Sequence, residues 1–334
     1  MKYRKIPGTN LKVSEVGFGV WTLSTGWWGE VSDEKAVHLL RYALDRGINF
    51  FDTADTYGNG RGETLVGDAL AGDRDRIVIA TKFGYDFYHH AGERTGQREL
   101  PQDFSPKFIQ FACEESLKRL RTDHIDLYQI HNPKMSAIEQ DDLYTTLEKL
   151  KKQGKILAWG AALGPAIGWL EEGLLLMRLR KAKNIQMIFN LLEQEPGLEF
   201  LKEGSRQGAG FFVRVPHSSG LLEGKYTKDT TFDANDHRSH RKREWLTKGL
   251  QKLEKLDFLT GGKNRTLGQA ALQFVLSYPA VVSVLPNIYG EEQINEFAVT
   301  SECPQLTARD LDRIGDLYEN NFYLEEGVTE NVSS

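Results

Sequence analysis

The chain has 334 residues, of which 40% are hydrophobic and 27% charged, and its formal net charge is −5. This composition is ordinary for a globular protein that buries a large core. The mild excess of acidic residues argues against nucleic-acid binding, which requires clustered positive charge. No apolar run approaches the roughly 20 residues that cross a bilayer, so no association with a membrane is expected.

The first ten residues, MKYRKIPGTN, lack the apolar stretch of a secretory signal peptide. The chain has two cysteines, Cys113 and Cys303, whose positions indicate neither a metal site nor a disulfide framework. Two reduced thiols are typical of a cytoplasmic protein, which is the location we expect. The oligomeric state is left open by the sequence.

A regular alternation of strand and helix patterns runs through the chain. Residues 2–13 come first and predict a β-hairpin that turns at Gly8-Thr9-Asn10. Eight segments rich in Val, Ile and Phe then predict strands. They are Glu15–Val20, Ile48–Ala54, Ile77–Gly84, Ile125–His131, Ile156–Ala162, Ile185–Asn190, Phe211–Pro216 and Val281–Pro286.

Amphipathic segments separate these strands and predict helices. The first follows Ser32 and begins with Asp33 and Glu34, acids that stabilise a helix N-terminus. Another begins at Ser105-Pro106, with proline in the first turn. Further helical segments are Leu143–Leu150, Leu170–Leu179 and Leu267–Leu276.

Eight strands that alternate with helices predict a parallel sheet, and eight such units favour a closed (β/α)8 TIM barrel of the α/β class. An open dinucleotide-binding sheet would begin with three spaced glycines, but Gly17-Phe18-Gly19 is not followed by the third. We therefore expect residues 1–334 to form one barrel domain, since barrels of this length are common.

Two long loops are expected in this barrel, after strands 3 and 7. They span residues 85–104 and 217–262, and the second is partly helical near Arg241–Leu259. Long loops in compact domains are usually functional, and in a barrel the loops that follow strands build the catalytic face.

Four polar residues stand at or just beyond the ends of strands 2, 3 and 4: Asp52, Tyr57, Lys82 and His131. Because side chains alternate along a strand, Asp52 and Lys82 share their faces with apolar or small residues that suit a barrel interior. Each of the four has an ordinary explanation by itself, such as turn formation or packing. Their coincidence at one end of a barrel favours a common pocket with a catalytic role.

These residue types fit the reduction of a carbonyl, which places negative charge on an oxygen that must receive a proton. A phenol ionises at about pH 10, so it is a reluctant donor unless a neighbouring ammonium stabilises its phenolate. Tyr57 is the expected general acid, and Lys82, held by Asp52, favours its ionised form. His131 would orient the carbonyl oxygen.

The four residues lie in segments that resemble the aldo-keto reductase superfamily along essentially the whole chain. The matching segments are GFGVWTL (17–23), GINFFDTADTYGNGRGETLVGDAL (47–70), DRIVIATKFG (75–84), CEESLKRLRTDHIDLYQIHNP (113–133), QGKILAWG (153–160) and VPHSSGLLEGKY (215–226). The resemblance implies hydride transfer between a nicotinamide nucleotide and a carbonyl or alcohol. The family's catalytic aspartate, tyrosine, lysine and histidine match Asp52, Tyr57, Lys82 and His131.

The resemblance also implies that the nucleotide lies across the mouth of the barrel. Gln186 would hydrogen-bond its carboxamide, and Lys225 would lie against its pyrophosphate. The positions that match the family's cofactor contacts are Val20, Trp21, Asp52, Gln186, Arg214, Val215, Pro216, His217, Ser218, Ser219, Leu222, Lys225, Asn287, Gln293 and Glu296.

Several of these anchors differ from the usual family pattern. Ala162-Leu163 replaces a Ser-Asn pair that bonds the carboxamide. Arg214 replaces the aromatic residue that stacks on the nicotinamide, although its planar guanidinium is also able to stack. Tyr289 stands where an arginine often binds the 2′-phosphate, and Phe297 replaces an asparagine near the adenine. Each lost hydrogen bond is worth roughly 0.5–1.5 kcal/mol.

NADP(H) is the cofactor we expect, with NAD(H) as the alternative. A basic run from Arg238 to Arg243 follows the seventh strand. It is either a solvated helix start or the source of an arginine, Arg238 or Arg241, that contacts the phosphate in place of the missing one.

The substrate pocket is expected to be lined by Trp21, Trp27, Trp28, Tyr57 and His131. Further candidates are Tyr85, Phe87 and Tyr88 in the loop after strand 3. The adjacent His89 and His90 point apart in most backbones, so we expect no metal there.

The expected function is the reduction of aldehydes, ketones or sugars, with a small carbonyl or alcohol as substrate. A nucleotide-binding sensor with little turnover is the alternative on the same fold, because the nucleotide anchors are altered while the four catalytic residues are complete. A metal-dependent lyase would need more ligands at the strand ends than Asp52 and His131.

Overall fold

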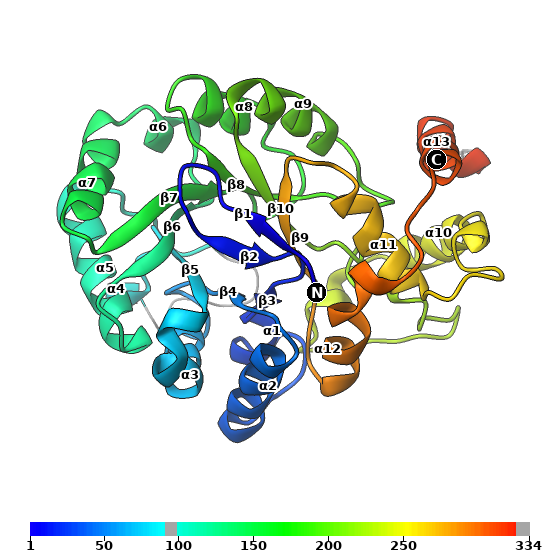
Figure 1. Ribbon diagram of the computed structural model, residues 1–334, viewed down its shortest axis with the longest axis horizontal. Helices are drawn as coiled ribbons and strands as arrows, with labels where there is room; N and C mark the ends of the chain where they lie inside the picture. The colour runs from blue at the N-terminus through cyan, green and yellow to red at the C-terminus, as the bar shows by residue number, and fades with distance from the viewer. Residues whose placement is uncertain (91–98, 325–334) are drawn as a thin grey trace, which may run out of the picture.

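Eight parallel strands form a barrel in the computed structural model, which describes residues 1–90 and 99–324. The sheet order is β10-β9-β8-β7-β6-β5-β4-β3. The strands are β3 (Phe18–Gly19), β4 (Phe50–Asp52), β5 (Val78–Phe83), β6 (Ile125–His131), β7 (Ile156–Ala162), β8 (Asn184–Ile188), β9 (Gly210–Arg214) and β10 (Val281–Leu285). A parallel bridge between Val16 and Val284 joins the two edges, and the predicted (β/α)8 barrel is confirmed (Figure 1).

Helices surround the barrel. They are α1 (Trp21–Ser24), α2 (Asp33–Asp45), α3 (Arg61–Leu70), α4 (Phe87–His90), α5 (Pro106–Leu120), α6 (Met135–Ile138), α7 (Asp141–Lys152), α8 (Leu170–Arg178), α9 (Gly197–Gln207), α10 (Arg243–Glu254), α11 (Leu267–Leu276), α12 (Glu291–Ala298) and α13 (Ala308–Glu319). The Ser32 and Ser105 side chains cap α2 and α5, because each accepts a hydrogen bond from the third amide of its helix. Across the ranges that the structure describes, none of these helices has the length and apolar character of a membrane span.

The observed ends of a strand match the predicted ones where the apolar segment is long and buried. The observed bounds of β6 and β7 are those expected from the sequence. The first expected strand, Glu15–Val20, contains only the short β3 and the bridge residue Val16, because the chain turns into α1 at Trp21.

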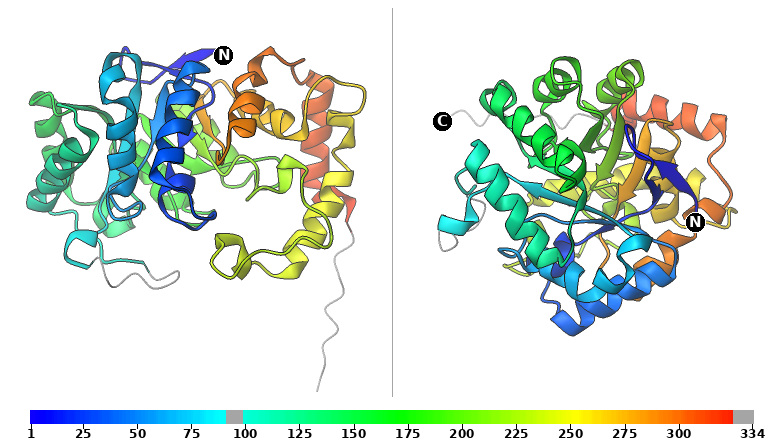
Figure 2. Two further views of the ribbon diagram at one scale, coloured as in Figure 1. Left: turned by 90° about the horizontal axis from the view of Figure 1, so that it is seen from below. Right: turned by 60° about the vertical axis from the view of Figure 1, so that its left-hand side comes forward.

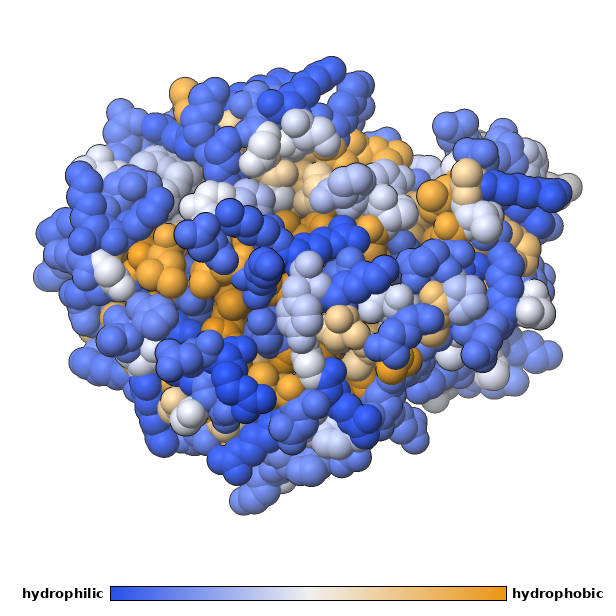
Figure 3. Space-filling model, in the orientation of Figure 1, coloured by the Kyte–Doolittle hydropathy of each residue, from blue (hydrophilic) through white to orange (hydrophobic). Residues whose placement is uncertain are grey.

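The N-terminal hairpin closes one end of the barrel. Its strands β1 (Tyr3–Lys5) and β2 (Lys12–Ser14) pair antiparallel. Buried Ile6 and Val13 belong to one apolar cluster with lumen residues that include Phe50 and Phe212. This end of the barrel is therefore packed with apolar side chains. Figure 3, in the orientation of Figure 1, shows that the outer surface on this side is mainly hydrophilic, with apolar patches between the polar residues.

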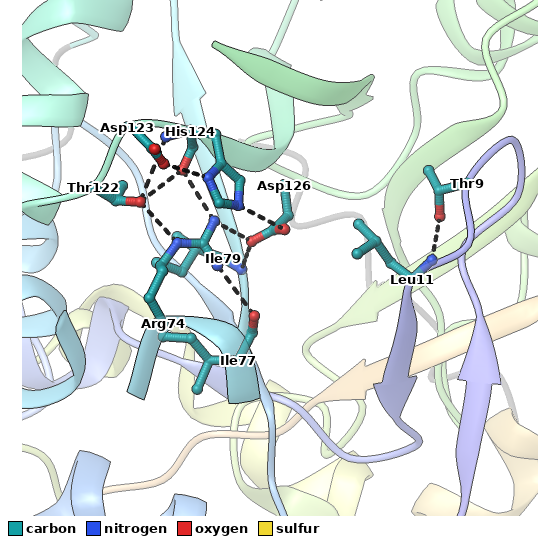
Figure 4. A network of polar contacts seen from close by, with 9 residues as sticks. All are labelled: Thr9, Leu11, Arg74, Ile77, Ile79, Thr122, Asp123, His124 and Asp126. Atoms are coloured by element: carbon teal, nitrogen blue, oxygen red, sulfur yellow. Dashed lines mark hydrogen bonds and ion pairs between the residues drawn. The ribbon is translucent and has the colours of Figure 1, made fainter. Parts of the chain in front are cut away.

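Arg74 ties together the chain segments that enter β5 and β6 (Figure 4). Its guanidinium donates to Asp126 Oδ2 at 2.7 Å and to the carbonyls of Ile77 and His124 at 3.2 and 3.0 Å. Asp126 also accepts from the Ile79 amide at 2.8 Å. Burial raises the pKa of Asp126 although Arg74 acts in the opposite direction. The starts of β5 and β6 are thus fixed in register.

The loops after the strands lie at the end of the barrel opposite the hairpin. In Figure 2, left, the hairpin is at the top, and the segments around residue 90 and residues 225–240 are at the bottom. Residues 91–98 of the expected 85–104 loop lie outside the described residues. The candidate site is therefore expected at the end of the barrel formed by these loops.

Candidate active site

Asp52 and Lys82 form an ion pair inside the barrel, where they are 4% and 1% exposed. Asp52 ends β4, and Lys82 lies on the adjacent β5. Lys82 Nζ donates to Asp52 Oδ1 at 2.6 Å and to the Thr53 carbonyl at 2.8 Å. Burial by itself lowers the pKa of Lys82, but the Asp52 carboxylate and the Tyr57 phenol outweigh it, so the pKa is raised above its ordinary value. The lysine is held as a cation.

Two glutamines complete the surroundings of Asp52. Gln129 Nε2 and Gln186 Nε2 both donate to Asp52 Oδ2, at 3.0 and 2.8 Å. They come from β6 and β8, so the carboxylate is hydrogen-bonded from three other strands of the barrel. The role of Gln129 was not anticipated, although it shares a strand face with His131 two residues later.

Tyr57 lies beside this ion pair. Lys82 Nζ is 5.0 Å from the centre of the Tyr57 ring, and the phenol also contributes to the raised pKa of Lys82 by charge and by hydrogen bonding. Gly58 permits the turn that presents the tyrosine, since its φ is +59° and an added Cβ would lie 2.3 Å from the Ser24 carbonyl oxygen. The ammonium and the phenol therefore share one site.

His131 ends β6 and faces Tyr57 across the same site. The two ring centres are 5.9 Å apart, and the Tyr85 ring lies 5.0 Å from His131 on another side. Gln102 Nε2 holds the end of this strand by donating to the carbonyls of His131 and Asn132 at 3.0 and 3.1 Å. Gln102 was not singled out in the sequence, where nothing marks a loop glutamine as a strand anchor.

A cavity of about 520 Å³ opens above these residues. This volume is in the range of small-molecule sites. All five residues expected in the substrate pocket line it: Trp21, Trp27, Trp28, Tyr57 and His131. Tyr85 also contributes to the wall, as expected.

Phe87 and Tyr88, the other two pocket candidates, pack elsewhere. The Arg119 guanidinium of α5 lies 5.7 Å from the Phe87 ring centre and 5.4 Å from that of Tyr88. Arg119 also donates to the Tyr88 hydroxyl at 2.8 Å. Because this half-buried cation holds both rings and neither lines the cavity, the expectation that they line the pocket is wrong. No cluster of three or more His, Cys, Asp or Glu suited to a metal occurs in residues 1–90 and 99–324.

The segment of residues 217–242, here called the mouth loop, folds over one side of the cavity. His237 N donates to the Trp27 carbonyl at 2.8 Å, and its ring stacks on Trp27 with centres 5.7 Å apart. The Arg238 guanidinium lies 4.0 Å from the centre of the Trp28 ring and pairs with Asp236 at 2.5 Å. The tryptophans and this loop thus form one continuous wall.

Arg214, at the end of β9, contributes a cation to the cavity wall. Its Nη2 donates to the carbonyls of Leu163 and Pro165 at 2.8 and 2.9 Å. Gly164 allows this approach, because an added Cβ would lie 2.1 Å from Arg214 Nη2. Leu163 therefore holds the arginine through its backbone, although its side chain offers no hydrogen bond.

The residues expected to contact the cofactor divide into two groups. Seven of them line the cavity: Trp21, Asp52, Gln186, Arg214, Val215, Ser219 and Asn287. The others do not, namely Val20, Pro216, His217, Ser218, Leu222, Lys225, Gln293 and Glu296. Lys225 is exposed, and most of the second group are buried in the framework around β9 and β10. For both groups, the contacts with a nucleotide stay predictions.

We expect acid to destabilise the fold through His217. Its Nε2 donates to the Gly268 carbonyl at 3.1 Å, and burial lowers its pKa to about 4. A histidine of the unfolded chain binds a proton near pH ~6.5. Between these two pH values the folded state therefore binds fewer protons than the unfolded state. The neutral His217 ring contributes its full share of the folding stability above about pH 6.5, and this share is lost as the pH falls toward the folded pKa.

This loss should reach about 3 kcal/mol at a pH near ~4, as measured by urea unfolding at a series of pH values. His217→Gln retains a donor for the Gly268 carbonyl and should show a flatter acid profile. An identical profile in the variant would assign the acid sensitivity to other groups.

Comparisons with known proteins agree with this geometry. Residues 15–319 match the model of the Aldo/keto reductase family. The chain is 29% identical to the aldo-keto reductase YhdN of Bacillus subtilis, over 96% of this chain and 94% of the relative. It is 29% identical to the NADH-specific methylglyoxal reductase of Escherichia coli, over 88% and 92% of the two chains.

A solved structure resembles the whole barrel. It is the glycerol dehydrogenase AKR11B4 from Gluconobacter oxydans, with a TM-score of 0.81 and 28% identity, over 97% of this chain and 98% of that one. The family match covers most of the chain and includes Asp52, Tyr57, Lys82 and His131. This chain belongs to the aldo/keto reductase family, whose named relatives above are oxidoreductases.

Proposed function

We propose that this protein reduces aldehydes, ketones or sugars to alcohols with a nicotinamide nucleotide, and that Tyr57 is the general acid. The observation that carries the proposal is the contact between the Tyr57 phenol and the buried Lys82 ammonium at the cavity wall. A phenol gives up a proton more readily where a fixed cation stabilises the phenolate.

The residues around the cavity suit a nicotinamide group. Gln186 uses its Nε2 to bond Asp52, which leaves its carbonyl oxygen without a donor among the described residues. An amide oxygen in this position is able to accept the N–H of a carboxamide. Ser219 and Asn287 would hold the nucleotide farther along the same wall. A bound nicotinamide nucleotide supplies the hydride that reaches the carbonyl carbon.

The protein's own residues then have separate tasks. The Tyr57 hydroxyl donates its proton to the carbonyl oxygen, and His131 hydrogen-bonds the same oxygen and orients it. Lys82 stabilises the phenolate that remains, while Asp52 and the two glutamines keep Lys82 in place. The tryptophans and the mouth loop, which pack on one another, would shield a bound carbonyl from water on their side of the cavity.

An enzyme is preferred to a nucleotide sensor because Asp52, Tyr57 and His131 line one cavity and Lys82 contacts two of them. The purified protein should oxidise NADPH or NADH when a panel of aldehydes is supplied, which absorbance at the nicotinamide band follows directly. Tight nucleotide binding without turnover of any carbonyl would instead indicate the sensor.

We propose NADP(H) as the preferred cofactor, with Arg241 as the residue that favours its extra phosphate. Arg241 Nη2 donates to Ser219 Oγ at 2.9 Å at the cavity wall, whereas Arg238 is already paired with Asp236. A guanidinium forms strong charge-assisted hydrogen bonds with phosphate. Arg241 is therefore better placed than Arg238 for this contact.

Arg241→Ala should raise the Kd for NADPH by about tenfold, the effect of losing one charge-assisted contact, and leave the Kd for NADH nearly unchanged. Quenching of tryptophan fluorescence measures both constants, since three tryptophans line the cavity. Arg243→Ala is the matched control, because Arg243 is exposed and donates to the Thr230 carbonyl instead. Equal weakening of both nucleotides would remove Arg241 from phosphate selection.

A further inference from the structure

Arg214 carries a positive charge in the cavity wall and forms no ion pair with an acidic residue of the part of the chain that the structure describes. Among the described residues its only hydrogen bonds are the two from Nη2 to the carbonyls of Leu163 and Pro165. No carboxylate of residues 1–90 or 99–324 lies within ion-pair distance of it. Arg214 is half-buried, and a cation that is partly removed from water without a counter-ion is costly; such groups are concentrated at functional sites.

The guanidinium is held rigidly at the end of β9. The two carbonyls clamp Nη2, and Gly164 leaves room for the arginine between them. Its Nε and Nη1 make no hydrogen bond to a described residue. The protein therefore fixes the guanidinium in position. Its Nε and Nη1 remain able to donate hydrogen bonds to a ligand in the cavity.

Burial lowers the pKa of Arg214, and the charges of Tyr57 and Asp52 are the largest effects that act in the opposite direction. An arginine stays charged even so, because its ordinary pKa is above about 12. The uncompensated charge thus acts on the same site as the proton donor.

The barrel places Arg214 across the cavity from the proton-donating side. Lys82 is on β5 and Arg214 on β9, four positions apart in the closed ring of eight strands. A carbonyl whose oxygen contacts Tyr57 and His131 turns its carbon away from them. A ring that supplies hydride to this carbon would occupy the remaining part of the cavity, whose lining includes Arg214 and Gln186.

We infer that Arg214 makes this site discriminate between the two redox forms of the cofactor, binding the reduced nicotinamide in preference to the oxidised one. The inference rests on the proposed function. The reduced ring is neutral, whereas the oxidised ring carries a positive charge that a fixed guanidinium repels, most strongly where water is excluded. The protein therefore favours carbonyl reduction and releases the oxidised cofactor readily.

The test is the ratio of the Kd for oxidised to reduced nucleotide, measured by tryptophan fluorescence without any substrate. The reduced form should bind at least about tenfold more tightly, which corresponds to about 1.4 kcal/mol. In Arg214→Gln, whose amide is still able to donate to the clamping carbonyls, the ratio should fall about tenfold, mainly through tighter binding of the oxidised form. Arg214→Lys keeps the charge and should preserve most of the ratio.

Three results would overturn the inference. One is a ratio near one in the unmodified protein, which needs no variant to fold. Another is an equal change of both constants in Arg214→Gln. The third is an unchanged ratio together with a raised KM only for carbonyls that carry a carboxylate, which would make Arg214 a substrate-binding residue. If neither redox form binds, the proposed function itself fails.

Discussion

Tyr57→Phe should lower kcat for carbonyl reduction by about three orders of magnitude, within the roughly 10²–10⁴-fold range of general acid catalysis. The variant keeps the ring that packs 5.9 Å from His131 but removes the hydroxyl beside Lys82. The alkoxide that forms during hydride transfer would then have no fixed proton source. Steady-state kinetics at saturating nucleotide measures the effect.

Nucleotide affinity should change little in this variant, because the hydroxyl acts on the carbonyl. Tyr85→Phe is the matched control, since Tyr85 lines the same cavity and its hydroxyl accepts from Asn132 at 3.0 Å. Its kcat should stay within a few fold of the unmodified protein. A Tyr57→Phe variant that turned over at the normal rate would eliminate Tyr57 as the proton donor.

Lys82→Met should abolish measurable turnover and also destabilise the fold by about 3–5 kcal/mol. The variant leaves the Asp52 carboxylate buried with two neutral glutamine donors and no cation. It also removes the charge that stabilises the phenolate. Urea unfolding gives the change in free energy, and the kinetic assay gives the loss of activity.

A second substitution separates the two effects of Lys82. Asp52→Asn in the Lys82→Met background removes the stranded charge, so the double variant should recover part of the stability but none of the activity. Lys118→Met is a suitable control, because Lys118 is paired with Glu115 at the surface and should change stability by less than about 0.5 kcal/mol. No recovery of stability in the double variant would show that lost packing, rather than the unpaired Asp52, causes the destabilisation.

The order of elements was accessible from sequence because strand and helix patterns are local. In the segments that form β6 and β7, apolar residues alternate with polar ones or follow one another without a break. This is the pattern of a buried strand and not the 3.6-residue period of a helix. The four candidate residues were also located from sequence, since each lies at or near the end of a strand or in the loop that follows it. In a parallel barrel all such ends meet at the same rim, so their proximity follows from the fold class.

Contacts across the lumen were not accessible in this way. Gln129 and Gln186 reach Asp52 only because the closed barrel turns β6 and β8 toward β4. Phe87 and Tyr88 were expected in the pocket from their loop position, but both rings pack on the half-buried Arg119 of α5 instead. Neither the glutamine bonds to Asp52 nor the packing on Arg119 produces a periodic pattern in the sequence.

The sequence by itself determined the barrel, its hairpin and the polar groups at the rim that we propose to be catalytic, because periodic burial and strand-end positions are properties of short segments. The tertiary structure alone decided which charges are compensated. It clamps Arg214 between backbone carbonyls and packs His237 on Trp27. Such contacts depend on how distant segments meet when the sheet closes, and charge compensation is set by those distances rather than by the order of residues.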